Sequence, residues 1–147
     1  MATQIFVSLP TSDLERAKAF YTGVGWPLNP QLSDDNGACF VVSEHIYLMI
    51  VAREFLATFT DKPIVDPSTM LQTQTGLSAD SREEVDAIIE RAIAAGGRED
   101  REAQDYGFMY SRDFEDPDGN HFGIIWSDPT ASDSGQGASA GQQSQGT

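Results

Sequence analysis

A strand–helix pattern with the same helix-start motif occurs twice in this chain of 147 residues. In the first copy, residues 4–9 alternate in polarity like a half-buried strand. Ser12-Asp13-Leu14-Glu15 follows as a capping box, in which the serine oxygen accepts hydrogen bonds from first-turn amides. In the second copy, residues 71–79 form a strand-like run, and Ser81-Arg82-Glu83-Glu84 repeats the motif. Two boxes at the same point of two units indicate an internal duplication.

Each motif is followed by a helix with one apolar face. The first helix is predicted over residues 13–22, and the second begins at the Ser81 motif and ends at Gly96-Gly97. Apolar residues recur at intervals of three and four, so one side of each helix is expected to be buried. These apolar stripes contain Leu14, Ala17, Phe20, Tyr21 and Val24 in the first helix, and Val85, Ile88, Ile89, Ala92 and Ile93 in the second.

Short strands are predicted to complete each unit. Apolar, β-prone runs follow the helices and are separated by turns, as in antiparallel hairpins. Residues 61–68 contain two prolines and are interpreted as a linker between the units. The predicted strands cover residues 38–42 and 46–51 in the first unit and residues 99–103, 108–114 and 121–126 in the second, with a turn at 116–120.

The composition excludes several classes of partner. A net charge of −14 would repel nucleic-acid phosphates and anionic lipid surfaces, so neither nucleic acid nor a membrane is expected as a partner. No apolar run approaches the roughly 20 residues that span a bilayer. The single cysteine, Cys39, cannot form an intramolecular disulfide, and the chain opens without a signal-like stretch. We therefore expect a soluble, cytoplasmic protein.

One domain is expected over residues 1–127. Its two modules are predicted at about residues 3–60 and 70–127. The remaining segment, residues 128–147, is rich in Ser, Gly and Gln and poor in large apolar residues. Such a composition cannot offset the entropy of ordering the backbone, so this tail is predicted to be disordered.

Both ends of the ordered region resemble a known family. Residues 6–21, FVSLPTSDLERAKAFY, resemble the first strand and helix of the vicinal-oxygen-chelate superfamily, which includes glyoxalases, bleomycin-resistance proteins and dioxygenases. The Asp-Pro-Asp-Gly-Asn turn at 116–120 resembles that of the family's final hairpin. The resemblance implies an α+β fold of two βαβββ modules that form an open, cupped mixed sheet with a ligand cavity inside. By analogy it also implies a homodimer.

The resemblance further implies where a divalent metal would be held. Metal-using members of the family carry a His or Gln on the first strand of each module and a carboxylate on the last. Among the corresponding residues, at most one of the four usual ligands survives, namely Gln74, whose amide oxygen could bind a hard cation. We therefore expect no cofactor, with a divalent metal held by Gln74 and His121 as the alternative. The four positions are Phe6, Gln74, Gly123 and one of Tyr47, Leu48 and Met49.

The two histidines receive different interpretations. His121 lies two residues before Gly123 and should project from the same face of its strand, so it is a candidate catalytic residue, either a displaced ligand or a general base. The other interpretation of His121 is a solvated or hydrogen-bonded edge residue just after a turn. His45 falls in a predicted turn and is expected to be exposed. Cys39, on an apolar strand, is expected to be buried and unreactive.

Other side chains predict a binding pocket more readily than a catalytic set. An apolar or aromatic molecule would suit the aromatic residues and Met on the predicted strands, although such residues also fill ordinary cores. The candidate ligand-binding residues are Phe6, Tyr47, Met49, Gln74, Phe108, Tyr110 and Arg112.

Three functions follow as hypotheses. The first is a metal-free, bleomycin-resistance-like protein that binds a small apolar or aromatic molecule in the cup between the modules. The second is a metal-dependent lyase, isomerase or dioxygenase that uses Gln74 and His121; an enzyme of this family would be lactoylglutathione lyase-like or dioxygenase-like. The third is a non-catalytic interaction or regulatory domain whose cup is filled by side chains.

Overall fold

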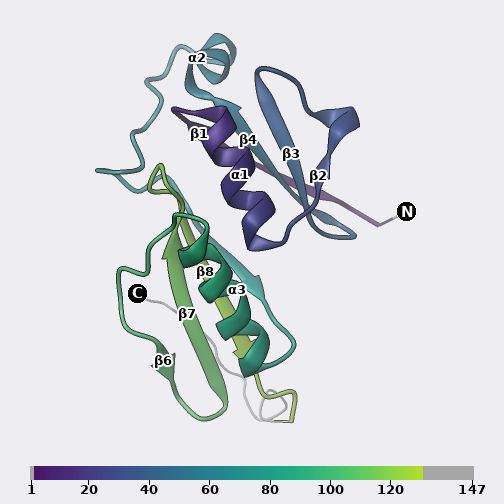
Figure 1. Ribbon diagram of the computed structural model, residues 1–147, viewed down its shortest axis with the longest axis vertical. Coiled ribbons are helices and arrows are strands. Elements are labelled where there is room, and N and C mark those ends of the chain that lie inside the picture. The colour runs from purple at the N-terminus through teal and green to yellow at the C-terminus, as the bar shows by residue number, and fades with distance from the viewer. Residues whose placement is uncertain (1, 131–147) are drawn as a thin grey trace.

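The computed structural model describes residues 2–130, and its helices and strands follow the duplicated order (Figure 1). The first module contains β1 (Ile5–Thr11), α1 (Leu14–Val24), β2 (Leu28–Asn29), the 3-10 turn η1 (Pro30–Leu32), β3 (Gly37–Ser43) and β4 (Ile46–Ala52). The short helices α2 (Arg53–Leu56) and η2 (Ala57–Phe59) follow. The second module contains β5 (Gln74–Ser78), α3 (Arg82–Ala94), β6 (Gln104–Asp105), β7 (Met109–Glu115) and β8 (His121–Ser127).

The strands form two mixed four-stranded sheets with the same topology. Their orders are β1-β4-β3-β2 and β5-β8-β7-β6. In each sheet the first strand of the module pairs in parallel with the last strand, and the other pairs are antiparallel. The predicted α+β fold of two βαβββ modules is therefore confirmed, and neither sheet closes into a barrel.

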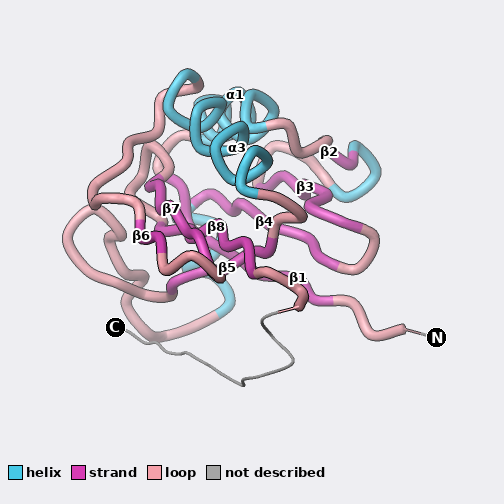
Figure 2. Tube along the Cα trace, turned by 90° about the horizontal axis from the view of Figure 1, so that it is seen from below, coloured by secondary structure: helices cyan, strands magenta, loops and turns pink. Residues whose placement is uncertain are grey.

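Both long helices cover the same side of the strands. Helices α1 and α3 lie next to each other above the sheets (Figure 2). Alternate strand residues, such as Leu9, Leu48 and Phe122, point toward the helices and are buried in the core. We call the opposite side the open face; Phe6, Ser8, Tyr47 and Met49 project from it in the first sheet, and Gln74, Asp113, Glu115, His121 and Gly123 in the second.

Aromatic side chains from both modules form one shared core. Phe20 and Tyr21 of α1 lie with their ring centroids 5.9 Å from Phe114 and Phe122, respectively. Trp26 of the first module lies 5.8 Å from Phe122. All five side chains are buried, so neither module has a complete core without the other.

The start of α1 differs from the prediction by one residue. Asp13, and not Ser12, is the N-cap, since its side chain accepts a hydrogen bond from Arg16 N at 3.0 Å. The capping box predicted at Ser12 is therefore wrong, because the Ser12 hydroxyl donates to Asp118 instead. At the second helix, Ser81 is the N-cap as predicted and accepts from Glu84 N at 3.0 Å.

The strand predicted at residues 99–103 is also wrong. This segment is a loop, and the short strand β6 begins after it at Gln104. The charged side chains of the 99–103 loop form ion pairs with β7. Glu99 lies 2.8 Å from Arg112, and Arg101 lies 3.7 Å from Asp113. Strand β5 begins at Gln74, later than the predicted residue 71.

The predicted tail at residues 128–147 falls almost entirely outside the described residues. Within residues 2–130, no helix is long and apolar enough to cross a membrane. Cys39 is buried, and burial raises the pKa of its thiol, in agreement with an unreactive side chain. His45 is exposed in the turn between β3 and β4, as predicted.

Candidate functional site

An exposed aromatic pair occupies the open face of the first module. Phe6 on β1 and Tyr47 on β4 are register partners, and their rings stack with centroids 4.8 Å apart and planes 12° apart. The Tyr47 hydroxyl accepts from Gln4 Nε2 at 3.1 Å and donates to the Glu44 carbonyl at 3.0 Å, which fixes the ring. Phe6 is nevertheless 49% exposed. The pair is thus an aromatic surface in which hydrogen bonds fix the Tyr47 ring and the Phe6 side chain is open to solvent.

Polar side chains occupy the open face of the second module. Gln74 on β5 and Glu115 on β7 are both register partners of His121 on β8, so the three residues form one row across the sheet. The His121 side chain is only 10% exposed, and its Nε2 lies 2.8 Å from Asp113 Oδ2. This hydrogen bond raises the pKa of His121 against the opposing effect of burial.

A glycine makes room for the Asp113–His121 contact. Asp113 on β7 is the register partner of Gly123 on β8, and a Cβ atom at Gly123 would lie 3.4 Å from Asp113 Oδ1. Any side chain longer than alanine would compete for the space beside this carboxylate. The β7 carboxylate therefore lies next to the position where β8 has no side chain.

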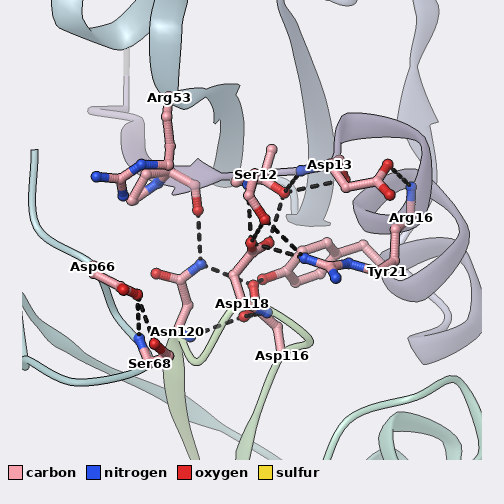
Figure 3. A network of polar contacts seen from close by, with 12 residues as sticks. Ser12, Asp13, Arg16, Tyr21, Arg53, Asp66, Ser68, Asp116, Asp118 and Asn120 are labelled. Atoms are coloured by element: carbon pink, nitrogen blue, oxygen red, sulfur yellow. Dashed lines mark hydrogen bonds and ion pairs between the residues drawn. The ribbon is translucent and has the colours of Figure 1, made fainter.

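A third cluster joins the two modules at the turn between β7 and β8 (Figure 3). Asp118 Oδ1 accepts from the backbone and hydroxyl of Ser12 and from Arg16, and its Oδ2 accepts from Thr11 Oγ1 at 2.6 Å. Asn120 donates to the Pro10 carbonyl at 3.1 Å. The turn whose sequence resembles the family motif thus binds the end of β1 and the start of α1.

A cavity of about 370 Å³ lies beside this junction. It is polar, and its two arginines already have partners within the chain: Arg16 binds Asp118, which also lines the cavity, and Arg53 donates to the carbonyls of Ile64 and Val65, which directly precede Asp66 in the sequence. Ser12, Asp66 and Ser68 complete its polar lining. We interpret the junction as structural, because its donors and acceptors are paired within the chain.

Comparison with known proteins decides the family. The model of the Glyoxalase/Bleomycin resistance protein/Dioxygenase superfamily matches residues 4–124. The chain belongs to this superfamily. A search of curated proteins gives no match.

Several solved structures share this fold. A hypothetical protein from S. aureus is 22% identical with a TM-score of 0.71, over 86% of this chain and 95% of that one. Lactoylglutathione lyase from Agrobacterium tumefaciens is 20% identical with a TM-score of 0.64, over 86% and 94%. A bleomycin resistance determinant encoded on transposon Tn5 is 18% identical with a TM-score of 0.61, over 86% and 98%. At these identities the likeness concerns the fold alone.

The side chains at the superfamily's metal-ligand positions do not fit a metal in this member. Phe6 has no donor atom, and Gly123 has no side chain. Met49 lies at the position on β4 that corresponds to Gly123 on β8, since Ser8 pairs with Met49 as Gly76 pairs with Gly123. Gln74 alone offers an oxygen, and one neutral amide is a weak site for a hard cation.

Two of the predicted ligand-binding residues lie on the other side of the sheet. Tyr110 and Arg112 alternate in step with the buried Phe114, so they point toward α3. Both bond Asp86 there, at 2.6 and 2.8 Å, and these bonds lower the pKa of Asp86. The prediction that they line the cup is therefore wrong; they border an open, charged depression of about 530 Å³ with Glu99 and other residues of the 99–103 loop.

Phe108 is also away from the open-face residues. It precedes β7, is exposed, and stacks on Tyr106 with centroids 6.4 Å apart. Of the seven predicted ligand-binding residues, the structure thus brings Phe6, Tyr47, Met49 and Gln74 to the open face. Sequence reasoning did not identify Glu115 or Asp100 as candidate site residues. Glu115 lies two residues after Asp113, and this spacing predicts that the Asp113 and Glu115 side chains share one face of the strand.

Replacing Asp113 with asparagine is expected to lower the pKa of His121, because the substitution removes the carboxylate that stabilises the charged ring. The folded-state pKa of His121 is raised above its ordinary value of 6.5. The contact therefore stabilises the fold fully below about pH 6.5 and loses its contribution as the pH rises through the folded-state pKa. NMR titration of the ring protons measures the shift. Identical titration curves for His121 in both proteins would contradict this account.

Proposed function

We propose that this protein binds a small apolar or aromatic molecule on its open face, without a metal at the superfamily's ligand positions. The observation that supports the proposal is the stacked pair of Phe6 and Tyr47, which leaves half of the Phe6 ring exposed. Covering the exposed part of this ring with a ligand removes apolar surface from water, which favours binding. A flat ligand over Phe6 would cover it.

The surroundings of the pair suit such a ligand. A ring stacked on Phe6 gains roughly 0.5–1.5 kcal/mol beyond the burial of its area. Met49 lies next along β4 on the same face and offers an adaptable apolar contact. On the open face of the second module, the exposed amide of Gln74 offers both donors and an acceptor for a polar group.

We also propose that a second copy of the chain completes the cup. Strands β1 and β5 are edge strands of their sheets, and large apolar residues such as Ile5 on β1 and Leu71 before β5 are exposed. An exposed edge with apolar side chains favours pairing with another chain. The homodimer rests on analogy with the superfamily.

The alternative is a metal-dependent lyase, isomerase or dioxygenase that uses Gln74 and His121. The structure brings these residues into register across β5 and β8, which favours the idea. Three of the superfamily's four ligand positions nevertheless carry no oxygen or nitrogen donor on a side chain. We therefore prefer binding without that metal.

Replacing Phe6 with serine is expected to weaken binding of a neutral aromatic probe, N-phenyl-1-naphthylamine, by about three- to tenfold, because the stacking surface is lost. Probe fluorescence, titrated with and without EDTA, measures the affinity. Phe59 is 68% exposed on η2, so Phe59→Ser is the matched control and should bind as the original protein does. Sedimentation of the same samples measures the mass of the assembly.

The other outcomes discriminate between the hypotheses. Equal affinity for the probe in Phe6→Ser would refute binding on the open face, and absence of binding in all variants would favour an interaction domain. Binding that EDTA abolishes would favour the metal-dependent alternative. A monomer mass at micromolar concentration would refute the homodimer.

A further inference from the structure

A second group of candidate ligands lies on the open face of the second module, beside Gln74 but using none of the superfamily's metal positions. One ligand atom each of Asp100, Glu115 and His121 lies within 4.8 Å of the other two. Glu115 and His121 face each other across β7 and β8, directly beside the tight turn that joins these strands. Asp100 reaches them from the 99–103 loop. We propose that this group binds a divalent ion of borderline hardness such as Zn²⁺.

The types of ligand fit this ion. Zn²⁺ takes imidazole nitrogen and carboxylate oxygen at about 2.0–2.2 Å, in tetrahedral sites whose ligand atoms are therefore about 3.4 Å apart. The separations here, at most 4.8 Å, exceed that value by up to about 1.4 Å. Asp100 is exposed and lies in a loop, so a side-chain rotation can close the difference. Three protein ligands would leave a fourth position for water or substrate.

A residue outside the group supports a ligand role for His121. The Asp113 carboxylate lies 2.8 Å from His121 Nε2, which leaves Nδ1 as the other ring nitrogen for an ion. Histidines that bind metals commonly donate a hydrogen bond from their second ring nitrogen to a carboxylate. This bond fixes the orientation of the ring and raises its basicity. Asp113 is the register partner of Gly123, whose missing side chain leaves open space beside this carboxylate. Asp113 is thus a positioning residue.

Two arginines already contact these carboxylates and would compete with an ion. Arg98 pairs with Glu115 Oε1 at 2.9 Å, but its side chain is 70% exposed. Arg101 lies 3.7 Å from Asp113 and is also exposed. Ion pairs with such an exposed partner contribute little to stability, so a divalent ion can replace the Arg98 contact at small cost. The net charge of −14 favours the approach of a cation.

This site is independent of the proposed function. It uses none of Phe6, Met49, Gln74 and Gly123, and its histidine lies two residues nearer the turn than Gly123, on the same open face of β8. Loss of probe binding in Phe6→Ser would leave it intact, and loss of the metal would leave the Phe6 surface intact. The two proposals can therefore fail separately.

Calorimetric titration of the full chain with zinc chloride tests the site, using protein without a histidine tag. One ion per chain is expected to bind, and His121→Gln and Glu115→Gln are each expected to weaken binding by at least tenfold. Asp113→Asn is expected to weaken it about tenfold through the orientation of the ring. The matched control is His45→Gln, because His45 also lies beside a carboxylate, Glu44, at 3.6 Å, but on the exposed turn. This variant should bind as the original protein does.

NMR of the His121 ring nitrogens supplies a readout that a structural defect would not reproduce. Zinc is expected to shift Nδ1 of His121 in the original protein, and far-UV circular dichroism verifies that each variant is folded. Binding below one-tenth of an ion per chain in the original protein would overturn the site. Equal affinities in the original protein and in folded Glu115→Gln and His121→Gln would overturn it as well.

Discussion

Replacing Asp116 with alanine is expected to lower the free energy of unfolding by about 3–5 kcal/mol, because this carboxylate accepts four hydrogen bonds in the interior. Asp116 is 3% exposed. Its Oδ1 accepts from the backbone amides of Asp118 and Asn120, and its Oδ2 accepts from the Tyr21 hydroxyl at 2.5 Å and from Asn120 Nδ2 at 2.9 Å. Alanine would leave all four donors without this acceptor. Urea denaturation measures the change.

The matched control is Asp35→Ala. Asp35 is exposed, and no hydrogen bond or ion pair is described for it within residues 2–130, so its loss should change stability by less than about 0.5 kcal/mol. A loss below 1 kcal/mol in Asp116→Ala would show that water satisfies the four donors. The Asp116 contact would then not be what joins the modules at this turn.

The duplicated unit made most of the fold predictable from the sequence. Helix start motifs and apolar stripes depend on neighbours three or four residues apart, and both helices lie within two residues of their predicted ranges. The segment at residues 99–103 could not be assigned correctly from such local patterns. Its residues are charged, and whether they pair as a strand or as ions depends on Arg112 and Asp113, which are nearby only after folding.

The candidate site was predictable where strand alternation was counted from a fixed point. His121 and Gly123 share a face, as their spacing of two predicted. Tyr110 and Arg112 were assigned to the wrong face because their alternation was not compared with that of Phe114, whose side chain is in the core. No local pattern predicts that Asp100 lies near His121, because a loop brings the two side chains together across 21 positions of sequence.

Replacing Phe122 with alanine is the other change with a large expected effect. Phe122 is fully buried on β8, and its ring stacks on Phe114 with centroids 5.0 Å apart. It also contacts Tyr21 and Trp26 of the first module, at 5.9 and 5.8 Å. Truncation of a buried Phe leaves a cavity and costs about 3–5 kcal/mol, which would be measured by urea denaturation. Phe59→Ala, at an exposed position, should cost far less.

The shared core predicts how the weakened protein unfolds. Trp26 belongs to the first module and Phe122 to the second, so a cavity at Phe122 removes contacts from both. Near-ultraviolet circular dichroism, which reports the packing of aromatic rings, and far-ultraviolet circular dichroism, which reports helices, should therefore lose signal at the same urea concentration. Two separate transitions in Phe122→Ala would contradict a single core, because one module would then be folding without aromatic contacts from the other.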